Sequence, residues 1–251
     1  MTRWVFDIGN TRLKCAPLGD DGRIGQVTAL AHVGHGQLAE LALLLPQRGD
    51  CAYVCSVASP QQFLAVIELL ARHFRCTSVA RATAAFAGVR NGYPLPARLG
   101  VDRFLAMIAA RSLGIGPWLV CGVGTAITVD LLDSEGMHRG GRIGPSPEVM
   151  RAGLHHAAAH LPPKGGQALA FALDTDDALA SGCEGAAVGL IQDSIAAAAS
   201  MLGSTPGLLL HGGGAQALVV RLAQAQHEPS LVLQGLATWA AAGKPDGSSN
   251  L

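Results

Sequence analysis

Residues 6–14 read FDIGNTRLK, and the pattern of this short stretch decides the fold expected for the first half of the chain. Strand interiors normally avoid Asp, Gly and Asn, yet an apolar run leads directly into these residues. Gly9-Asn10 is typical turn chemistry, with apolar alternation on both sides. The stretch therefore predicts a β-hairpin whose tip carries a carboxylate, a hydroxyl and an amine, from Asp7, Thr11 and Lys14.

A second stretch, residues 121–130 (CGVGTAITVD), repeats this pattern in the second half of the chain. Gly124 aligns with Gly9, and in each half three strands precede helices that alternate with strands, starting near residues 3 and 117. The economical interpretation is an internal duplication of one α/β unit, with a cleft between the two copies. Clefts between lobes are favoured places for ligands.

Hydrophobic periodicity and turn residues place the elements of the two halves. Strands are expected at 3–8, 13–18, 26–31, 52–57 and 76–80, then at 118–121, 126–132, 138–142, 207–211 and 231–233. Helices are expected at 37–45, 59–74 and 101–113, then at 147–160, 177–201, 215–223 and 236–241. The expected domains are an N-terminal lobe (1–115), a C-terminal lobe (116–242) and a polar tail (243–251).

Composition narrows the class of protein. The 251 residues are 49% hydrophobic and 14% charged, which favours well-packed lobes over disorder. Lys plus Arg equals Asp plus Glu, so bulk charge gives no support for nucleic-acid binding. The first residues have no long apolar core, and the most apolar run, 186–202, is interrupted by Gln192 and Asp193. Six scattered cysteines without a Cys-x-x-Cys pair fit reduced thiols, and a cytoplasmic protein without membrane spans is expected.

The two glycine turns are the first candidate site. Glycine lets backbone amides approach a phosphate closely, and threonine hydroxyls at 11, 125 and 128 could add donors. Asp7 could hold magnesium, directly or through water, because Mg²⁺ prefers one or two carboxylates plus phosphate oxygens. Lys14 could neutralise phosphate charge. The alternative, two ordinary β-turns, is less favoured because the pattern occurs twice.

Three other motifs are weaker signals of a ligand site. GVGTAI (122–127) does not open a helix, as a dinucleotide-binding fingerprint must, and no Walker-type phosphate loop occurs. LLHGGGA (209–215) suits a nucleotide base or ribose lying on backbone, or simply a tight strand–helix turn. His156 and His160 lack the Glu of a zinc-binding His-Glu-x-x-His motif and favour a structural role.

LGVDRFLA (99–106) places an Asp and an Arg in the first turn of an otherwise apolar helix. Asp102 could be a general base that takes a proton from a substrate hydroxyl, with Arg103 holding a phosphate or carboxylate. Asp in the first turn of a helix also matches the helix dipole, so a capping role is the alternative.

Taken together, these motifs resemble the type III pantothenate kinases. The resemblance rests on Asp7-x-Gly-Asn-Thr-x-x-Lys14, Gly100-Val-Asp-Arg103, Gly124-Thr-Ala-x-Thr-x-Asp130 and Gly140-Gly-Arg-Ile-x-Pro145, whose order and spacing match over nearly the whole chain. It implies two actin-like, ribonuclease H-like lobes of mixed sheet flanked by helices. The implied activity is phosphorylation of pantothenate by ATP at the start of coenzyme A biosynthesis, by a homodimer that binds pantothenate at its interface.

The resemblance also implies a role for each matched residue. Asp102 corresponds to the base that acts on the pantothenate hydroxyl. Positions that match the pantothenate site are Tyr93, Gly100, Val101, Asp102, Arg103 and Thr175. Positions that match the ATP phosphate loops are Asp7, Gly9, Asn10, Thr11 and Lys14, together with Gly124, Thr125 and Ala126.

The chain departs from the family pattern at two positions. The family usually has an Asp two residues before the glycine of Gly-Thr-Ala, where it helps to bind potassium or ammonium, and here that position is Gly122. A glycine side chain cannot ligate a cation, so either another group replaces the Asp or the cation site is lost. We expect activity to respond weakly when potassium replaces sodium. The usual Pro-Gly after Gly-Gly-x-Ile-x is Pro145-Ser146, at a turn expected to open a helix.

Two rival functions remain at the level of sequence. A kinase of the same superfamily that acts on a sugar or another small alcohol would keep Asp7 and Gly124 but has no need of Tyr93. A regulatory protein that has lost catalysis and acts through a partner is supported only by Gly122. Retention of Asp7, Asp102 and Arg103 together favours the enzyme.

Overall fold

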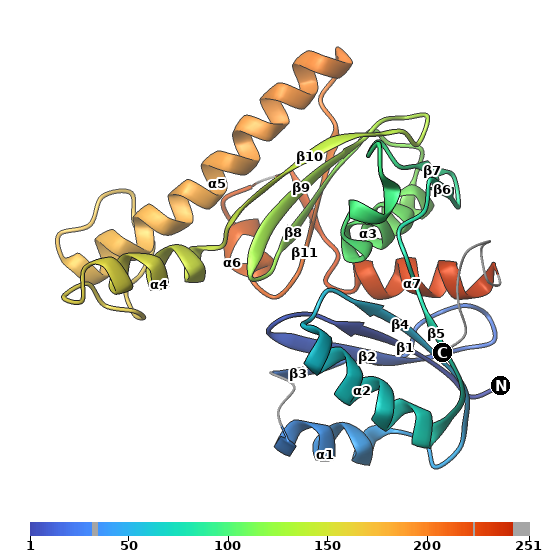
Figure 1. Cartoon of the computed structure of the whole chain (residues 1–251). Coiled ribbons are helices and arrows are strands. Elements are labelled where there is room, and N and C mark those ends of the chain that lie inside the picture. Colours follow the sequence, from blue (N-terminus) through green and yellow to red (C-terminus); the bar gives the residue numbers. More distant parts are fainter. Residues whose placement is uncertain (32–34, 223, 243–251) are drawn as a thin grey trace. The chain divides into compact units, whose positions relative to one another are not determined.

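The computed structural model describes residues 1–31, 35–222 and 224–242 (Figure 1). The chain forms two compact units. The first contains Met1–Ile115 and the segment that begins at Ser230, and the second contains Gly116–Pro229. The chain therefore leaves the first unit, builds the whole of the second, and returns.

The first unit is built on a five-stranded mixed sheet of order β3-β2-β1-β4-β5. Its strands are β1 (Arg3–Ile8), β2 (Arg12–Leu18), β3 (Thr28–Ala31), β4 (Gly49–Ser56) and β5 (Phe74–Val79). β1, β2 and β3 form an antiparallel meander, whereas β4 and β5 continue the sheet in parallel with β1. A two-stranded ribbon, β6 (Ala85–Phe86) and β7 (Val89–Arg90), lies in the connection that follows.

Helices cover both faces of this sheet (Figure 1). One face carries α1 (His35–Leu44) and α2 (Pro60–His73), and the other carries α3 (Val101–Leu113) and α7 (Leu231–Ala241). A short 3₁₀ turn, Pro96–Arg98, precedes α3. Ser59 caps α2, because its hydroxyl accepts from the Gln62 amide while the Gln62 side chain accepts from the Ser59 amide.

The second unit repeats the strand order, β10-β9-β8-β11-β12. Its strands are β8 (Trp118–Val123), β9 (Ala126–Leu132), β10 (His138–Pro145), β11 (Gly207–His211) and β12 (Ala225–His227). Its helices are α4 (Pro147–Ala157), α5 (Thr175–Leu202) and α6 (Ala215–Val219). An apolar core of its own joins β8, β9 and β11 to α5 and α6.

The expected duplication is confirmed by this topology. In both units an antiparallel meander is continued by two parallel strands in the same spatial order. Gly9 and Gly124 are each the first residue after the central strand, β1 or β8. Asp7 and Gly122 therefore occupy equivalent positions, each next to the last residue of its strand.

The C-terminal elements differ from the prediction. Residues 231–233 begin α7 instead of forming a strand, and the fifth strand is β12, which the sequence did not indicate. α7 also belongs to the first unit, because it packs closely on α3 and on β1. A Cβ added to Gly235 would lie 1.9 Å from the Leu105 carbonyl oxygen, so only glycine permits this approach of the two helices. The predicted polar tail, 243–251, lies outside the described residues.

α5 is the one helix of the described residues that is long and apolar enough to cross a membrane by length and composition alone. Core helices of globular units pass the same test, so it carries little weight. Arg142 on β10 pairs with Asp193 on α5 and also donates to the Ser194 hydroxyl at 3.2 Å. These polar contacts join the middle of α5 to the sheet of its own unit.

Candidate active site

Asp7 is the central carboxylate of the first unit. It lies on β1 between two strands, with Lys14 on β2 as its antiparallel partner and Cys55 on β4 as its parallel partner. Burial and the nearby Asp102 carboxylate raise the pKa of Asp7 to about 7, against opposing effects of Lys14 and of a hydrogen bond with Cys55. Burial also lowers the pKa of Lys14, which the charge of Asp7 partly offsets.

Cys55 is a contact of Asp7 that the sequence did not reveal as part of the site. Its side chain is fully buried and its thiol donates a hydrogen bond to the Asp7 carboxylate. Burial and the two carboxylates raise the pKa of Cys55 well above its ordinary value, so the thiol keeps its proton and acts as a donor. The sequence places Cys55 only within the expected strand 52–57, and the pairing of that strand with β1 comes from the structure.

Asp102 lies in the first turn of α3, as predicted. Its Oδ1 accepts a hydrogen bond from the Arg103 amide at 2.9 Å, so the carboxylate folds back over the N-terminus of the helix. A Cβ at Gly100 would lie 2.7 Å from that oxygen, which explains why glycine precedes the Val-Asp-Arg sequence. Val101, the first residue of α3, is half-buried.

Arg103 and Tyr93 meet in the same unit. The Arg103 side chain is buried, its Nη1 donates to the Tyr93 hydroxyl at 3.2 Å, and its guanidinium carbon lies 5.9 Å from the centre of the Tyr93 ring. Tyr93 is held by its own amide, which donates to the Asn91 side chain at 3.0 Å. The structure thus brings together two residues that the sequence assigned to the substrate.

The two glycine turns differ in detail. The Gly9 amide donates to the Arg12 carbonyl and the Gly124 amide donates to the Ala126 carbonyl, each at 3.0 Å. These two amides therefore close their own turns, and the turn between β8 and β9 is one residue shorter. The predicted phosphate contacts are left to the neighbouring exposed residues, Asn10, Thr11 and Thr125, and to half-buried Ala126.

His211 ends β11 beside the second turn, with Gly122 as its register partner on β8. The glycines that follow pack on β8, since the Gly214 amide donates to the Val123 carbonyl at 3.0 Å. Gly212 has φ +94°, and a Cβ there would lie 2.4 Å from the same carbonyl oxygen. LLHGGGA thus forms a tight strand–helix turn, and its contact with a nucleotide remains a prediction.

Two further motifs act as supports in the second unit. Asp130 and His138 are buried and form a hydrogen bond of 2.9 Å between Asp130 Oδ1 and His138 Nε2, joining β9 to β10. Ser146 caps α4 by accepting from the Val149 amide at 3.2 Å, so the departure from Pro-Gly supplies a helix cap. α4 ends at Ala157, so the prediction of one helix that carries both His156 and His160 is wrong. No cluster of metal-ligating side chains forms in the described ranges.

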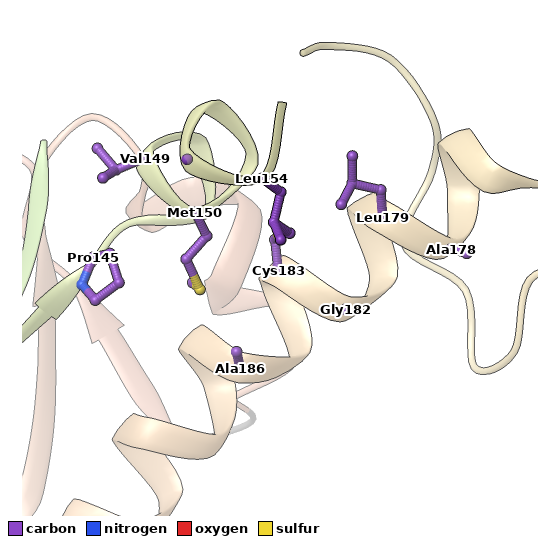
Figure 2. Close-up of a pocket in the computed structure, with 10 residues that line it drawn as sticks. Pro145, Val149, Met150, Leu154, Ala178, Leu179, Gly182, Cys183 and Ala186 are labelled. Carbon is purple, nitrogen blue, oxygen red and sulfur yellow. The ribbon is translucent and has the colours of Figure 1, made fainter. Parts of the chain in front are cut away.

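Thr175, the remaining substrate candidate, is the exposed first residue of α5. The same helix and α4 enclose an apolar pocket of about 560 Å³ (Figure 2). Figure 2 shows Met150 and Leu154 on α4 facing Leu179 and Cys183 on α5 across it. The structure assigns Thr175 and this pocket to the second unit, and the cluster of Asp7, Asp102, Arg103 and Tyr93 to the first.

The first-unit cluster fits a divalent cation. Burial is the main cause of the raised pKa of Asp7, and the charge of the nearby Asp102 carboxylate adds to it. A bound cation would stabilise both carboxylates in their charged form, and magnesium takes one or two carboxylates from a protein when phosphate oxygens complete its shell. Asp7 and Asp102 are therefore the side chains of the first unit that would hold such an ion.

Comparison with known proteins agrees with this chemistry. A family model described as type III pantothenate kinase matches residues 4–197. A type III pantothenate kinase of Stenotrophomonas maltophilia (strain K279a) is 51% identical over 240 residues, covering 96% of this chain and 98% of that protein. One of Xylella fastidiosa (strain 9a5c) is 51% identical over 241 residues, with the same coverage of both chains.

Solved structures with the same fold are more distant. A protein from Campylobacter jejuni assigned as a Baf family transcriptional activator aligns with TM-score 0.62 and 18% identity, covering 96% of this chain and all of that one. A protein from Sinorhizobium meliloti assigned as a 2-dehydro-3-deoxygalactonokinase aligns with TM-score 0.59 and 18% identity, covering 97% of each chain. At this identity the likeness shows the fold alone. The family match and the full-length relatives together show that this chain belongs to the type III pantothenate kinase family.

Proposed function

We propose that this protein transfers the γ-phosphoryl group of ATP to the primary hydroxyl of pantothenate, forming 4'-phosphopantothenate in the first step of coenzyme A biosynthesis. The observation that carries the proposal is the Asp102 carboxylate, held at the N-terminus of α3 beside both Arg103 and Asp7. Full-length relatives that are about half identical and named type III pantothenate kinase support the same reaction.

Asp102 acts as the general base. Its Oδ1 is fixed by the Arg103 amide, so the carboxylate is oriented before substrate arrives. It accepts the proton of the pantothenate hydroxyl as the oxygen attacks the γ-phosphorus. Arg103 and Tyr93, already joined to each other, bind the substrate, and the planar guanidinium suits its carboxylate.

Asp7 and Lys14 serve the phosphates. Asp7 holds magnesium, directly or through water, and magnesium, when bound, neutralises charge on the phosphate oxygens. Lys14 faces Asp7 across β1 and β2 and adds positive charge on the same face of the sheet. The turn residues Asn10, Thr11, Thr125 and Ala126 orient the nucleotide through hydroxyl, amide and backbone groups.

Self-association is part of the proposal. The pocket between α4 and α5 is lined almost entirely by apolar groups, and Val149 and Leu154 at its edge are about two-fifths exposed. Thr175, matched to pantothenate by resemblance, lies on the helix that forms one wall. We infer a homodimer in which a second copy of the chain covers this face, with pantothenate bound beside it.

A cytoplasmic location fits the absence of disulfides among the described cysteines.

The test is a coupled ADP-release assay with pantothenate, run in parallel with hexoses and other small alcohols. Of the acceptors tested, we expect only pantothenate to give turnover with ATP. Asp102→Asn should lower kcat by at least about a hundredfold while leaving the melting temperature near that of the wild type. Near-wild-type turnover in that variant would exclude Asp102 as the base. No turnover with pantothenate would exclude the proposed reaction, and turnover with a hexose would favour a sugar kinase.

A further inference from the structure

The end of β8 has an unusual arrangement of three strand positions. Gly122 is paired with Thr128 on β9 and with His211 on β11, so all three positions lie in one row across the sheet. Residues at paired positions of neighbouring strands point to the same face. A side chain at position 122 would therefore project between the hydroxyl of Thr128 and the imidazole of His211.

That space is already filled. A Cβ at position 122 would lie 2.8 Å from Thr128 Oγ1, 2.9 Å from His211 Cε1 and 3.0 Å from His211 Nε2. These separations are shorter than ordinary contacts of a carbon atom, even before a carboxylate is added to the Cβ. The imidazole thus rests against the Cα of Gly122, and an aspartate fits there only if the ring moves away.

The ring can leave this place only by rotating about its own side-chain bonds, because the backbone that carries it is fixed to β8. β11 pairs with β8 up to His211 itself, and the next residues fold back onto the same strand. The Gly214 amide donates to the Val123 carbonyl, and the left-handed conformation of Gly212 brings that turn against the same oxygen. The Cα of His211 is therefore fixed beside Gly122 by the backbone on both sides of it.

A monovalent cation does not fit this arrangement. Alkali ions take oxygen ligands, chiefly carboxylates and carbonyls. The row offers one hydroxyl, from Thr128, and an imidazole ring where the carboxylate expected from the resemblance would stand. At the equivalent position of the first unit a carboxylate, Asp7, is present, so the two copies of the duplication have diverged here.

We propose that the His211 imidazole permanently takes the place of a cation-binding carboxylate and its monovalent cation. It would thereby position the glycine turn at Gly124 and Thr125 without potassium or ammonium. This inference rests on the proposed function, because it assigns His211 to the ATP site of that reaction. The ring supports the strand end from which Gly124 and Thr125 project, and it acts on the nucleotide through that turn.

The first experiment compares the wild type in potassium, sodium and choline chloride at equal ionic strength. Two readouts are taken, the rate of ADP release and the melting temperature of the protein without substrates. We expect both to be the same in the three salts, with rates within about twofold and no rise of the melting temperature with potassium, since a bound ion would raise it. Activation of about tenfold or more by potassium, or a potassium-dependent rise in melting temperature, would overturn the inference.

The second experiment uses His211→Ala, Gly122→Asp and the double variant Gly122→Asp/His211→Gly. His211→Ala should raise the KM for ATP about tenfold and leave the KM for pantothenate within about twofold, whereas the exposed His160→Ala should change neither. Gly122→Asp should lower the melting temperature in every salt, and the double variant should restore it and make it rise with potassium. Equal effects of His211→Ala on both KM values, or a double variant no more stable than Gly122→Asp, would overturn the inference.

The two hypotheses fail separately. If no salt supports phosphorylation of pantothenate, the proposed function is wrong, while the melting temperatures of the Gly122 and His211 variants still show whether the ring fills the site. If pantothenate is phosphorylated but potassium is required, the function stands and the role of His211 is wrong.

Discussion

Asp7 meets two opposing physical demands in one side chain. Ionising a carboxylate that is shielded from water and lies near another carboxylate costs free energy. The pKa of Asp7 is therefore raised to about 7. The same pair of carboxylates, Asp7 and Asp102, is what would attract a divalent cation. Asp7 would therefore favour ligand binding at the expense of the stability of the unliganded protein.

The stability of the unliganded protein should consequently depend on pH through Asp7. Because its folded-state pKa lies above the ordinary value of 3.8, its contribution is present at low pH and is lost as the pH rises through about 7. Between about pH 5.5 and about pH 8, with EDTA present, the free energy of unfolding should fall by on the order of 2 kcal/mol more in the wild type than in Asp7→Asn. Urea unfolding at the two pH values measures this difference, and parallel pH profiles of the two proteins would contradict it.

Gly100 offers a second test, aimed at the orientation of Asp102, the proposed base. The Cβ of Gly100→Ala would push on Asp102 Oδ1, so kcat should fall about tenfold while the fold is retained. Gly189→Ala on α5 is the matched control, because a Cβ there meets nothing within 4 Å. Steady-state kinetics with melting curves compare them. An unchanged kcat in Gly100→Ala would show that the carboxylate needs no such room.

At the scale of elements, α4 and α5 form the face on which the proposed dimer depends. Leu179→Asp places a charge in the apolar pocket, so it should convert dimer to monomer and lower activity with pantothenate. Leu64→Asp on α2, which is 57% exposed, makes the same change on the first unit and should alter neither. Sedimentation velocity gives the oligomeric state. A Leu179→Asp protein that stays dimeric would place the interface elsewhere.

Local patterns predicted most elements, because their signals lie within a few residues. The capped start of α2, the full extent of α3 and both glycine hairpins follow from turn residues and periodicity. The short apolar run 231–233 was wrong as a strand, because so few residues cannot distinguish strand from helix. β12 carries no strand signal of its own and forms only by pairing with β11.

The candidate site was predictable where a motif is contiguous and not where strands bring residues together. Asp102 and Arg103 are neighbours in sequence, and the resemblance supplied Tyr93. The contact of Cys55 with Asp7, and of His211 with Gly122, depends on strand register, which a single sequence does not give. Both missed contacts join the central strand of a unit to its parallel neighbour.

At the scale of the whole molecule, the two units differ in chain continuity. The second unit is one uninterrupted segment, whereas the first needs α7 to cover the face of its sheet on which α3 lies. Trp239 on α7 is buried there, in edge contact with Tyr53 on β4. Removing α7 would therefore expose apolar surface of the first unit and leave the second unit intact.

Fragments of the chain should show this asymmetry. Residues 116–229 expressed alone should give a cooperative thermal transition, because their core is complete. Residues 1–115 alone should bind a hydrophobic dye and melt without cooperativity, and adding a peptide of residues 230–242 should restore a transition. Circular dichroism and dye fluorescence measure both. A cooperative 1–115 fragment would show that α7 is dispensable.

The return of the chain to its first unit also has a consequence on the ribosome. The first unit cannot be completed by the segment that begins at Ser230 until Gly116–Pro229 has been translated. That takes roughly 6 to 23 s at about 5–20 residues per second. During that interval the nascent first unit presents an open apolar face, and the second unit is complete before the segment from Ser230 returns to cover that face. The unit that carries Asp102, the proposed base, is begun first and finished last, so we expect its folding in the cell to depend on protection during synthesis.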